Sequence, residues 1–185
     1  MSKMSNIAYT QKVAGRLLKA VMLCCGLIFC SFQAGNKDNE YKLKAAFLYN
    51  FIQYIDWGNT APANEYTICI VGTSPIDAPL REIAATRKDS EKKIKIVHCK
   101  SAAEITYAHI LFISKNVDEP LDAILAKVPK GTLTVGERPG CAKEGAAMNF
   151  VIIDNKLKFE SNLKALNASG LKASSQLLKL AIITE

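Results

Sequence analysis

Cysteine is the residue type in this sequence with the clearest capacity for covalent chemistry. Of the six cysteines, Cys69, Cys99 and Cys141 lie beyond the N-terminal 34 residues. Their spacing is far too wide for the C-x-x-C motifs of redox proteins or zinc sites. Three cysteines allow one disulfide and leave one thiol. A structural bridge and inert buried thiols both stay open, and each is favoured over a catalytic cysteine.

The two histidines and the absence of known catalytic motifs argue against an enzyme. His98 ends a predicted strand beside Cys99, and His109 opens a buried strand, where a hydrogen-bonded core histidine is expected. The sequence lacks G-x-S-x-G, H-E-x-x-H, P-loop and G-x-G-x-x-G spacings. We therefore expect no catalytic residue, no metal site and no cofactor.

A weaker signal, for small-molecule binding, lies in the turns after two predicted strands. The segment VGTSP contains Gly72, Thr73 and Ser74 at the carboxyl end of a strand, where ligands bind in parallel sheets. Glu137 and Arg138 follow another strand, and we favour a solvated loop there over a carboxylate-binding pair. Gly72, Thr73, Ser74 and Arg138 are the candidate ligand-binding residues.

The N-terminal region predicts export. Residues 1–19 carry four basic side chains and no acidic one. An apolar run of about a dozen residues follows, as in a secretory signal peptide, whereas a membrane span needs roughly 20 apolar residues. We interpret residues 1–34 as a signal peptide cleaved near Ala34 or Gly35, with an uncleaved anchor as the alternative. The protein is then expected in the periplasm, where disulfides are permitted.

Charge and length indicate one domain that does not bind nucleic acid. The chain has 24 basic and 17 acidic residues, a net charge of +7. Four of the basic residues lie in the predicted leader, so residues 35–185 carry a net charge of only +3. No cluster of Lys and Arg interleaved with aromatic residues appears. Residues 35–185 have the length of a single domain.

Alternating strand and helix patterns predict an α/β fold. The apolar and β-branched runs that indicate parallel strands are 66–72, 93–99, 108–114 and 131–137. Residues 148–154 and 156–162 are separated only by a turn at Asp154 and Asn155, which joins antiparallel strands. We predict a three-layer domain with a mainly parallel sheet of about four strands, a C-terminal antiparallel β-hairpin, and helices on both faces.

The stretch YKLKAAFLYNFIQYIDWG (41–58) predicts the first helix of this domain. Its apolar side chains cover an arc of about 200°, whereas a surface helix needs only about 100°. We favour a helix wedged into the core; the alternative is a second contact with a neighbouring helix, a twin subunit or another protein. Lys44 interrupts the arc in the first turn, where its side chain can extend outward. Tyr49, Asn50 and Trp57 are the candidate partner-binding residues, with Trp57 off the arc at the helix exit.

The order of several segments resembles that of the YfiR family of exported α/β proteins. The most specific are KAAFLYNFIQYIDW and FESNLKALNASGLKASSQLLKLA, and TICIVG, AHILFIS and LTVGERPGCAKEGAAMNF lie between them. The resemblance implies a periplasmic, non-enzymatic protein. It also implies binding to the periplasmic part of an inner-membrane diguanylate cyclase, which the protein represses in cyclic di-GMP and biofilm signalling. A ligand-binding sensory module is the alternative.

The resemblance also implies a disulfide pattern from which this sequence departs. In the family, a cysteine in the strand matching AHILFIS pairs with the one matching Cys69, but Ala108 stands there. Cys99 is the remaining candidate partner of Cys69. We expect the two to be offset by ~10 Å at 3.3 Å per residue, beyond the roughly 7 Å between Cα atoms that a bridge allows. Cys141 lies where some relatives have a second bridge, but its partner position is Met148, so a free thiol is expected.

Overall fold

The structure is a computed structural model that describes residues 34–60, 65–86 and 93–184. The chain forms two compact units, residues 1–39 and residues 40–185. Of the first unit only the helical residues 34–39 are described, and the α/β fold belongs to the second unit. Residues 1–33 of the predicted signal peptide lie outside the described residues.

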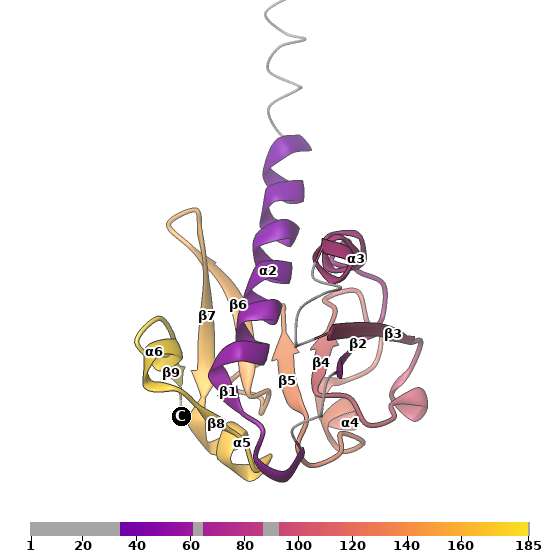
Figure 1. Ribbon diagram of the computed structural model, residues 1–185, viewed down its shortest axis with the longest axis vertical. Helices are drawn as coiled ribbons and strands as arrows, with labels where there is room; N and C mark the ends of the chain where they lie inside the picture. Colours follow the sequence, from indigo (N-terminus) through magenta and orange to yellow (C-terminus); the bar gives the residue numbers. More distant parts are fainter. Residues whose placement is uncertain (1–33, 61–64, 87–92, 185) are drawn as a thin grey trace, which may run out of the picture. The chain divides into compact units, whose positions relative to one another are not determined.

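A seven-stranded sheet forms the centre of the second unit (Figure 1). In order across the sheet, its strands are β3 (Lys93–Cys99), β2 (Glu65–Val71), β4 (Ile110–Ile113), β5 (Leu133–Gly136), β6 (Met148–Ile153), β7 (Lys156–Asn162) and β9 (Ile182–Thr184). The first five run parallel, and β6 and β7 form an antiparallel hairpin. The predicted α/β architecture is confirmed.

The sheet is wider than predicted, for two reasons. Strand β6 pairs with β5 in parallel as well as with β7, so the hairpin belongs to the main sheet. The C-terminal strand β9 then pairs in parallel with β7. At the hairpin turn, Asp154 and Asn155 have φ angles of 50° and 56°. Positive φ at both central residues is the requirement of a type I′ turn, whose twist matches that of the strands it joins.

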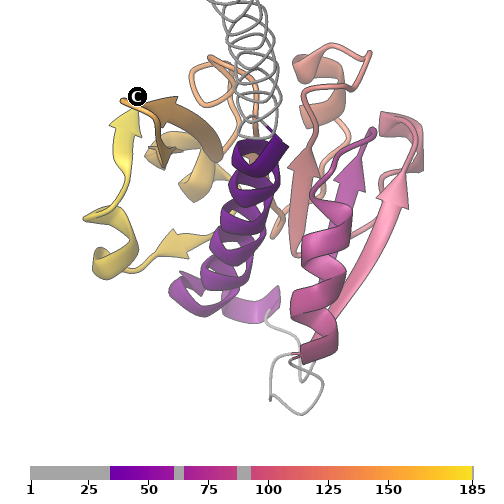
Figure 2. The same ribbon diagram turned by 90° about the horizontal axis from the view of Figure 1, so that it is seen from above.

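Helices cover both faces of the sheet and give three layers. They are α2 (Ala34–Tyr54), α3 (Asp77–Thr86), α4 (Leu121–Leu125), α5 (Leu163–Ala168) and α6 (Ser175–Leu178), with short 3-10 turns η1 (Gly58–Thr60) and η2 (Ala102–Glu104). Helices α2, α3, α5 and α6 contribute to the core on one face, and α4 and η2 to the core on the other. Figure 2 shows α2 and α3 side by side on their face.

The alternation of side chains along the parallel strands supplies both cores. On β2, Ile68 and Ile70 face α2 and α3, whereas Cys69 and Val71 face α4. This period of two is inherent to an extended strand. Because both faces are covered, β4 and β5 are fully buried along their whole length.

The first helix ends earlier than predicted. Helix α2 stops at Tyr54, because the chain then turns into β1 (Ile55–Asp56), which pairs with β8 (Lys172–Ala173) in a separate two-stranded sheet. Trp57 therefore lies outside the helix and is only 4% exposed. Its ring packs against Tyr66, and its Nε1 donates a hydrogen bond to the Ile52 carbonyl at 3.3 Å. Trp57, one of the candidate partner-binding residues, is therefore a core residue, and partner binding by it stays a prediction.

Candidate functional site

The carboxyl ends of β2, β4 and β5 bring together the loops in which the sequence predicts ligand contacts. Thr73 follows β2, Ser114 follows β4 and Glu137 follows β5. The Ser114 hydroxyl donates to the Thr73 carbonyl at 2.7 Å. The Lys115 backbone N–H donates to Glu137 Oε1 at 3.1 Å. Hydrogen bonds thus join the three loops into one polar edge, which we call the carboxyl edge.

Lys44 of α2 lies over the carboxyl edge and forms a buried ion pair. Its Nζ is 2.8 Å from Glu137 Oε2 and 2.5 Å from Glu40 Oε1. Lys44 is 3% exposed and the Glu137 side chain is fully buried. Burial alone lowers the pKa of Lys44, but hydrogen bonds and charges from Glu137 and Glu40 outweigh it, and the pKa is raised. The ammonium therefore stays charged, as a buried pair requires.

Two expectations about this edge are wrong. Lys44 does not extend into solvent, because its ammonium donates a hydrogen bond to the buried carboxylate of Glu137 at the end of β5. Glu137 does not lie in a solvated loop, because α2 covers it. The carboxyl end of β5 is therefore covered by the protein's own ion pair.

The predicted ligand-binding residues lie in the loops of this edge and next to it. Gly72 has a φ of +80°, and a Cβ there would lie 3.1 Å from Val117 Cβ, so the glycine has a structural role. The Ser74 hydroxyl accepts a hydrogen bond from the Ile76 N–H at the start of α3. Arg138 follows Glu137 and is half-buried. Ligand binding by Gly72, Thr73, Ser74 and Arg138 stays a prediction.

The opposite side of α2 leaves a second apolar surface in solvent. A groove of about 330 Å³ lies between α2 and α6, and we call it the α2–α6 groove; its lining is Phe47, Asn50, Tyr54, Gln176, Leu177 and Leu180. Tyr54 is 41% and Leu180 68% exposed, and Leu43 is exposed further along the helix. Leu43, Phe47, Asn50 and Tyr54 recur at spacings of four, three and four residues, so they follow one stripe of the helix.

The wide apolar arc of α2 is therefore divided between two environments. Leu48, Phe51 and Ile52 are fully buried against the sheet. Phe51 anchors this side, with its ring 5.2 Å from that of Phe159 and 6.1 Å from that of Phe150. Of the stripe on the other side, Leu43, Asn50 and Tyr54 are exposed, whereas Phe47 is half-buried and packs against the core. Of the candidate partner-binding residues, Asn50 lines the α2–α6 groove. Tyr49, which precedes Asn50 in the sequence, is half-buried.

Cys69 and Cys99 lie close together in the core beneath α4. The strands are in register with Cys69 opposite Val97 and Val71 opposite Cys99, so the cysteines are offset by two residues. Two residues correspond to about 7 Å along a strand, and the expected offset of ~10 Å was too large. The Sγ atoms are 2.7 Å apart. Burial, followed by the hydrogen bond to Cys99, raises the pKa of the Cys69 thiol, which makes it a poor nucleophile.

Cys141 is also buried, in the loop between β5 and β6. It lies directly against Gly136, where an added Cβ would be 2.7 Å from the Cys141 Cβ. The close approach explains why a glycine ends β5. All three described cysteines are free thiols in this structure.

Both histidines have structural partners. His109 Nδ1 accepts a hydrogen bond from the Thr67 N–H at 3.0 Å, and its ring packs among those of Trp57, Tyr66 and Tyr107. Burial lowers the pKa of His109, opposed by a backbone hydrogen bond to Thr60. His98 lies at the surface, 2.8 Å from an Asp77 oxygen.

Neither a metal centre nor a membrane span is found in the part of the chain that the structure describes. No group of three or more His, Cys, Asp or Glu side chains there could hold a metal ion. None of the helices described combines the length and hydrophobicity needed to cross a bilayer.

Comparison with known proteins assigns the family. Residues 41–182 match the sequence profile of the YfiR/HmsC-like proteins. The chain belongs to the YfiR/HmsC-like family. YfiR-like proteins are known as periplasmic regulators of diguanylate cyclases, and the family is regulatory in character. No curated protein matches the sequence significantly.

Two solved structures align with the YfiR-like domain, one of them with a TM-score above 0.5. A conserved domain protein from Vibrio cholerae aligns with a TM-score of 0.53 at 10% identity, over 78% of this chain and 60% of that one. The ABC domain from Streptococcus pneumoniae in complex with L-Trp aligns with a TM-score of 0.46 at 12% identity, over 64% of this chain and 54% of that one. The chain thus spans about three fifths of the length of the Vibrio cholerae protein, and that likeness supports the α/β fold alone.

Proposed function

We propose that this protein is an exported, non-enzymatic regulator that binds the periplasmic part of an inner-membrane diguanylate cyclase and holds it inactive. The family match over residues 41–182 carries the regulatory assignment. The α2–α6 groove supplies a surface for the partner, because it exposes large apolar side chains that the protein's own core does not cover. Exposed apolar surface of this kind marks interaction sites more often than chance.

The composition of the groove fits protein binding. Phe47 and Tyr54 provide aromatic surface, which is enriched at interface hot spots. Asn50 and Gln176 provide polar groups at the same surface that can fix the orientation of a partner. The exposed stripe on α2 has the four-three-four spacing with which one helix packs against another. A helical segment of the signalling protein is the partner that this surface fits.

A small-molecule sensory module is the alternative function, and the carboxyl edge gives it less support. The ion pair of Lys44 with Glu137 covers the carboxyl end of β5, one of the strand ends near which ligands of α/β sheets bind. A ligand there would have to displace a buried charge. A thermal-shift screen with aromatic and phosphorylated metabolites tests this alternative. A rise in the melting temperature with any of these metabolites would support the sensory function.

The test of the proposed function is complementation of a deletion strain. Deleting the gene is expected to raise cyclic di-GMP and biofilm formation, and the wild-type gene should restore both. Leu180→Glu places a charge in the α2–α6 groove and should fail to restore them. It should also weaken binding to the purified periplasmic domain by at least about tenfold, since apolar anchors dominate interface energetics.

Ile152→Glu is the matched control. Ile152 is 57% exposed on the β6–β7 hairpin and lies outside the groove lining. Both substitutions add a carboxylate to an exposed apolar position, where stability changes are usually within about 0.5 kcal/mol. Full complementation by Leu180→Glu would exclude the groove as the binding surface. Unchanged cyclic di-GMP in the deletion strain would exclude the proposed function itself.

A further inference from the structure

Among the residues that the structure describes, the outer edge of β3 is the longest unpaired strand edge of the sheet. Strand β3 extends over seven residues, Lys93–Cys99, and among the described residues it pairs with β2 alone. Strand β9, at the other end of the sheet, has three residues. Unpaired N–H and C=O groups along a strand edge are a template for another strand, and proteins usually cover or shorten such edges.

The direction of the backbone groups on β3 follows from its pairing with β2. The Gly72 N–H donates to the Cys99 carbonyl at 3.2 Å, so the backbone of Cys99 faces β2. Because successive residues of a strand alternate sides, Ile94, Ile96 and His98 direct their N–H and C=O groups outward. Three donors and three acceptors are therefore available at spacings that match an added strand.

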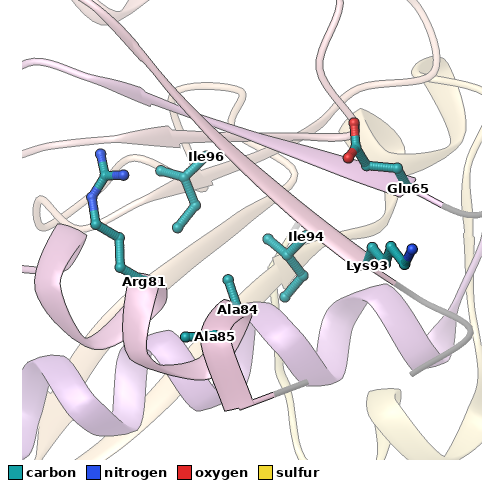
Figure 3. A pocket seen from close by; sticks show the side chains of 7 residues that line it. All are labelled: Glu65, Arg81, Ala84, Ala85, Lys93, Ile94 and Ile96. Carbon is teal, nitrogen blue, oxygen red and sulfur yellow. The ribbon is translucent and has the colours of Figure 1, made fainter. Parts of the chain in front are cut away.

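An apolar groove borders this edge on the α3 side. It has a volume of about 510 Å³, and its lining, shown in Figure 3, is Glu65, Arg81, Ala84, Ala85, Lys93, Ile94 and Ile96. Ile94 and Ile96 extend from β3 towards the alanines of α3 and remain half-exposed. Arg81 already pairs with Asp77. An added strand could direct alternate apolar side chains into this groove.

Two lysines lie along the same edge, and the one acidic residue of the groove lining, Glu65, lies opposite Lys93 on β2. Lys93 and Lys95 are both exposed, and neither forms an ion pair with a described residue. Lys95 lies on the face opposite Ile94 and Ile96, because side chains alternate along the strand. Opposite charges on adjacent strands stabilise pairing, whereas like charges destabilise it. Edge-to-edge pairing of two copies would bring two lysine pairs together, so the charges favour an acidic strand over a second copy.

We propose that the free edge of β3 is a β-augmentation site for an extended segment of a partner protein in which apolar and acidic residues alternate. The apolar residues would enter the groove beside α3, and the acidic residues would lie beside Lys93 and Lys95. The main-chain groups of Ile94, Ile96 and His98 provide the hydrogen bonds. This surface lies on β3, whereas the α2–α6 groove lies between two helices. The proposal for β3 does not depend on the function proposed for that groove.

The test measures the binding of labelled seven-residue peptides to the full mature protein by fluorescence anisotropy. One peptide alternates Glu with Val, and its control alternates Lys with Val. A third is the acidic peptide with methyl groups on the backbone nitrogens that face β3. The acidic peptide should bind at least about tenfold more tightly than the basic one, because its charges oppose those of the lysines. The methylated peptide should not bind.

Charge-reversed variants then locate the site. The double substitution Lys93→Glu with Lys95→Glu should reverse the preference between the acidic and basic peptides. Lys156→Glu with Lys158→Glu is the control for charge alone, since these lysines are exposed at the same spacing on β7 and lie outside the lining of the groove beside α3. Equal binding of the two charged peptides, or the same loss in both double variants, would overturn the proposal. The proposal would also be overturned if the wild-type protein self-associates and the Lys93→Glu with Lys95→Glu variant does not, because the strand that pairs with β3 would then belong to a second copy of this chain. Leu180→Glu should leave peptide binding unchanged.

Discussion

We predict a disulfide between Cys69 and Cys99, and the size of its effect on stability can be calculated. The two Sγ atoms are 2.7 Å apart, and a bond forms at about 2.05 Å. The neighbouring β2 and β3 strands hold both residues in the buried core beneath α4. Export through an oxidising compartment would allow the bridge to form during folding, before burial raises the pKa of the Cys69 thiol and slows its chemistry.

The size of the effect follows from the loop that the bridge would close. Cys69 and Cys99 are separated by 30 positions. A loop of this length restricts the unfolded chain by about 4 kcal/mol in the chain-entropy account. For a domain of this size, a stabilisation of about 4 kcal/mol raises the melting temperature by about 8–16 °C. The oxidised protein should therefore melt that much higher than the reduced one.

The assay compares oxidised protein with protein that has been reduced while unfolded and then refolded. Reduction must take place in denaturant, because both sulfurs are buried in the native state. Alkylation followed by mass spectrometry should find one blocked thiol, Cys141, and a peptide that links Cys69 to Cys99. Cys69→Ala should lower the melting temperature to that of reduced protein, whereas Cys141→Ala should leave the effect of reduction intact. Three alkylated thiols in protein purified from the periplasm would refute the reasoning, as would a bridge that includes Cys141.

Three further predictions concern stability. Lys44→Met should destabilise the fold by about 3–5 kcal/mol in urea denaturation, because it leaves the Glu137 carboxylate buried without its partner. The free energy of unfolding should fall as the pH drops below about 6.5, the ordinary pKa of histidine. Burial lowers the pKa of His109 in the folded state, so the unfolded chain takes up the proton at a higher pH than the folded protein does. Gly136→Ala should cost about 1–3 kcal/mol, measured by the same denaturation, because the new methyl group would overlap Cys141.

Each of these predictions has a control. Lys44→Met combined with Glu137→Gln removes both charges and should recover most of the loss; a double variant as unstable as the single one would contradict the ion-pair argument. His109→Asn keeps an acceptor for the Thr67 N–H and should flatten the stability profile between pH 5 and 7. A slope unchanged by this substitution would assign the pH dependence to other groups. Gly136→Ala together with Cys141→Ala should be milder than Gly136→Ala alone.

Local sequence determined where the parallel strands and the hairpin lie along the chain. The period-two and continuous apolar patterns located all four predicted parallel strands, since burial on one or both faces of an extended chain leaves a mark within a few residues. The turn at Asp154 and Asn155 was predictable for the same reason, because both tolerate the positive φ that a two-residue hairpin needs. The family assignment also came from contiguous segments, and residues 41–182 confirm it.

Tertiary structure decided the environment of the residues whose partners are distant in the sequence. Lys44 lies 93 positions from Glu137, and no local pattern reveals that the two meet; a lysine within an apolar arc was the one available signal. Trp57 became a core residue because β1 pairs with residues 172–173, which ends the helix early. The offset of Cys69 and Cys99 depended on the register between β2 and β3, which pairing between strands fixes. The sequence by itself determined the four parallel strands, the hairpin and the presence of the first helix, whereas packing determined the end of that helix, the pairing of β1, β8 and β9, and which charged and aromatic side chains are buried.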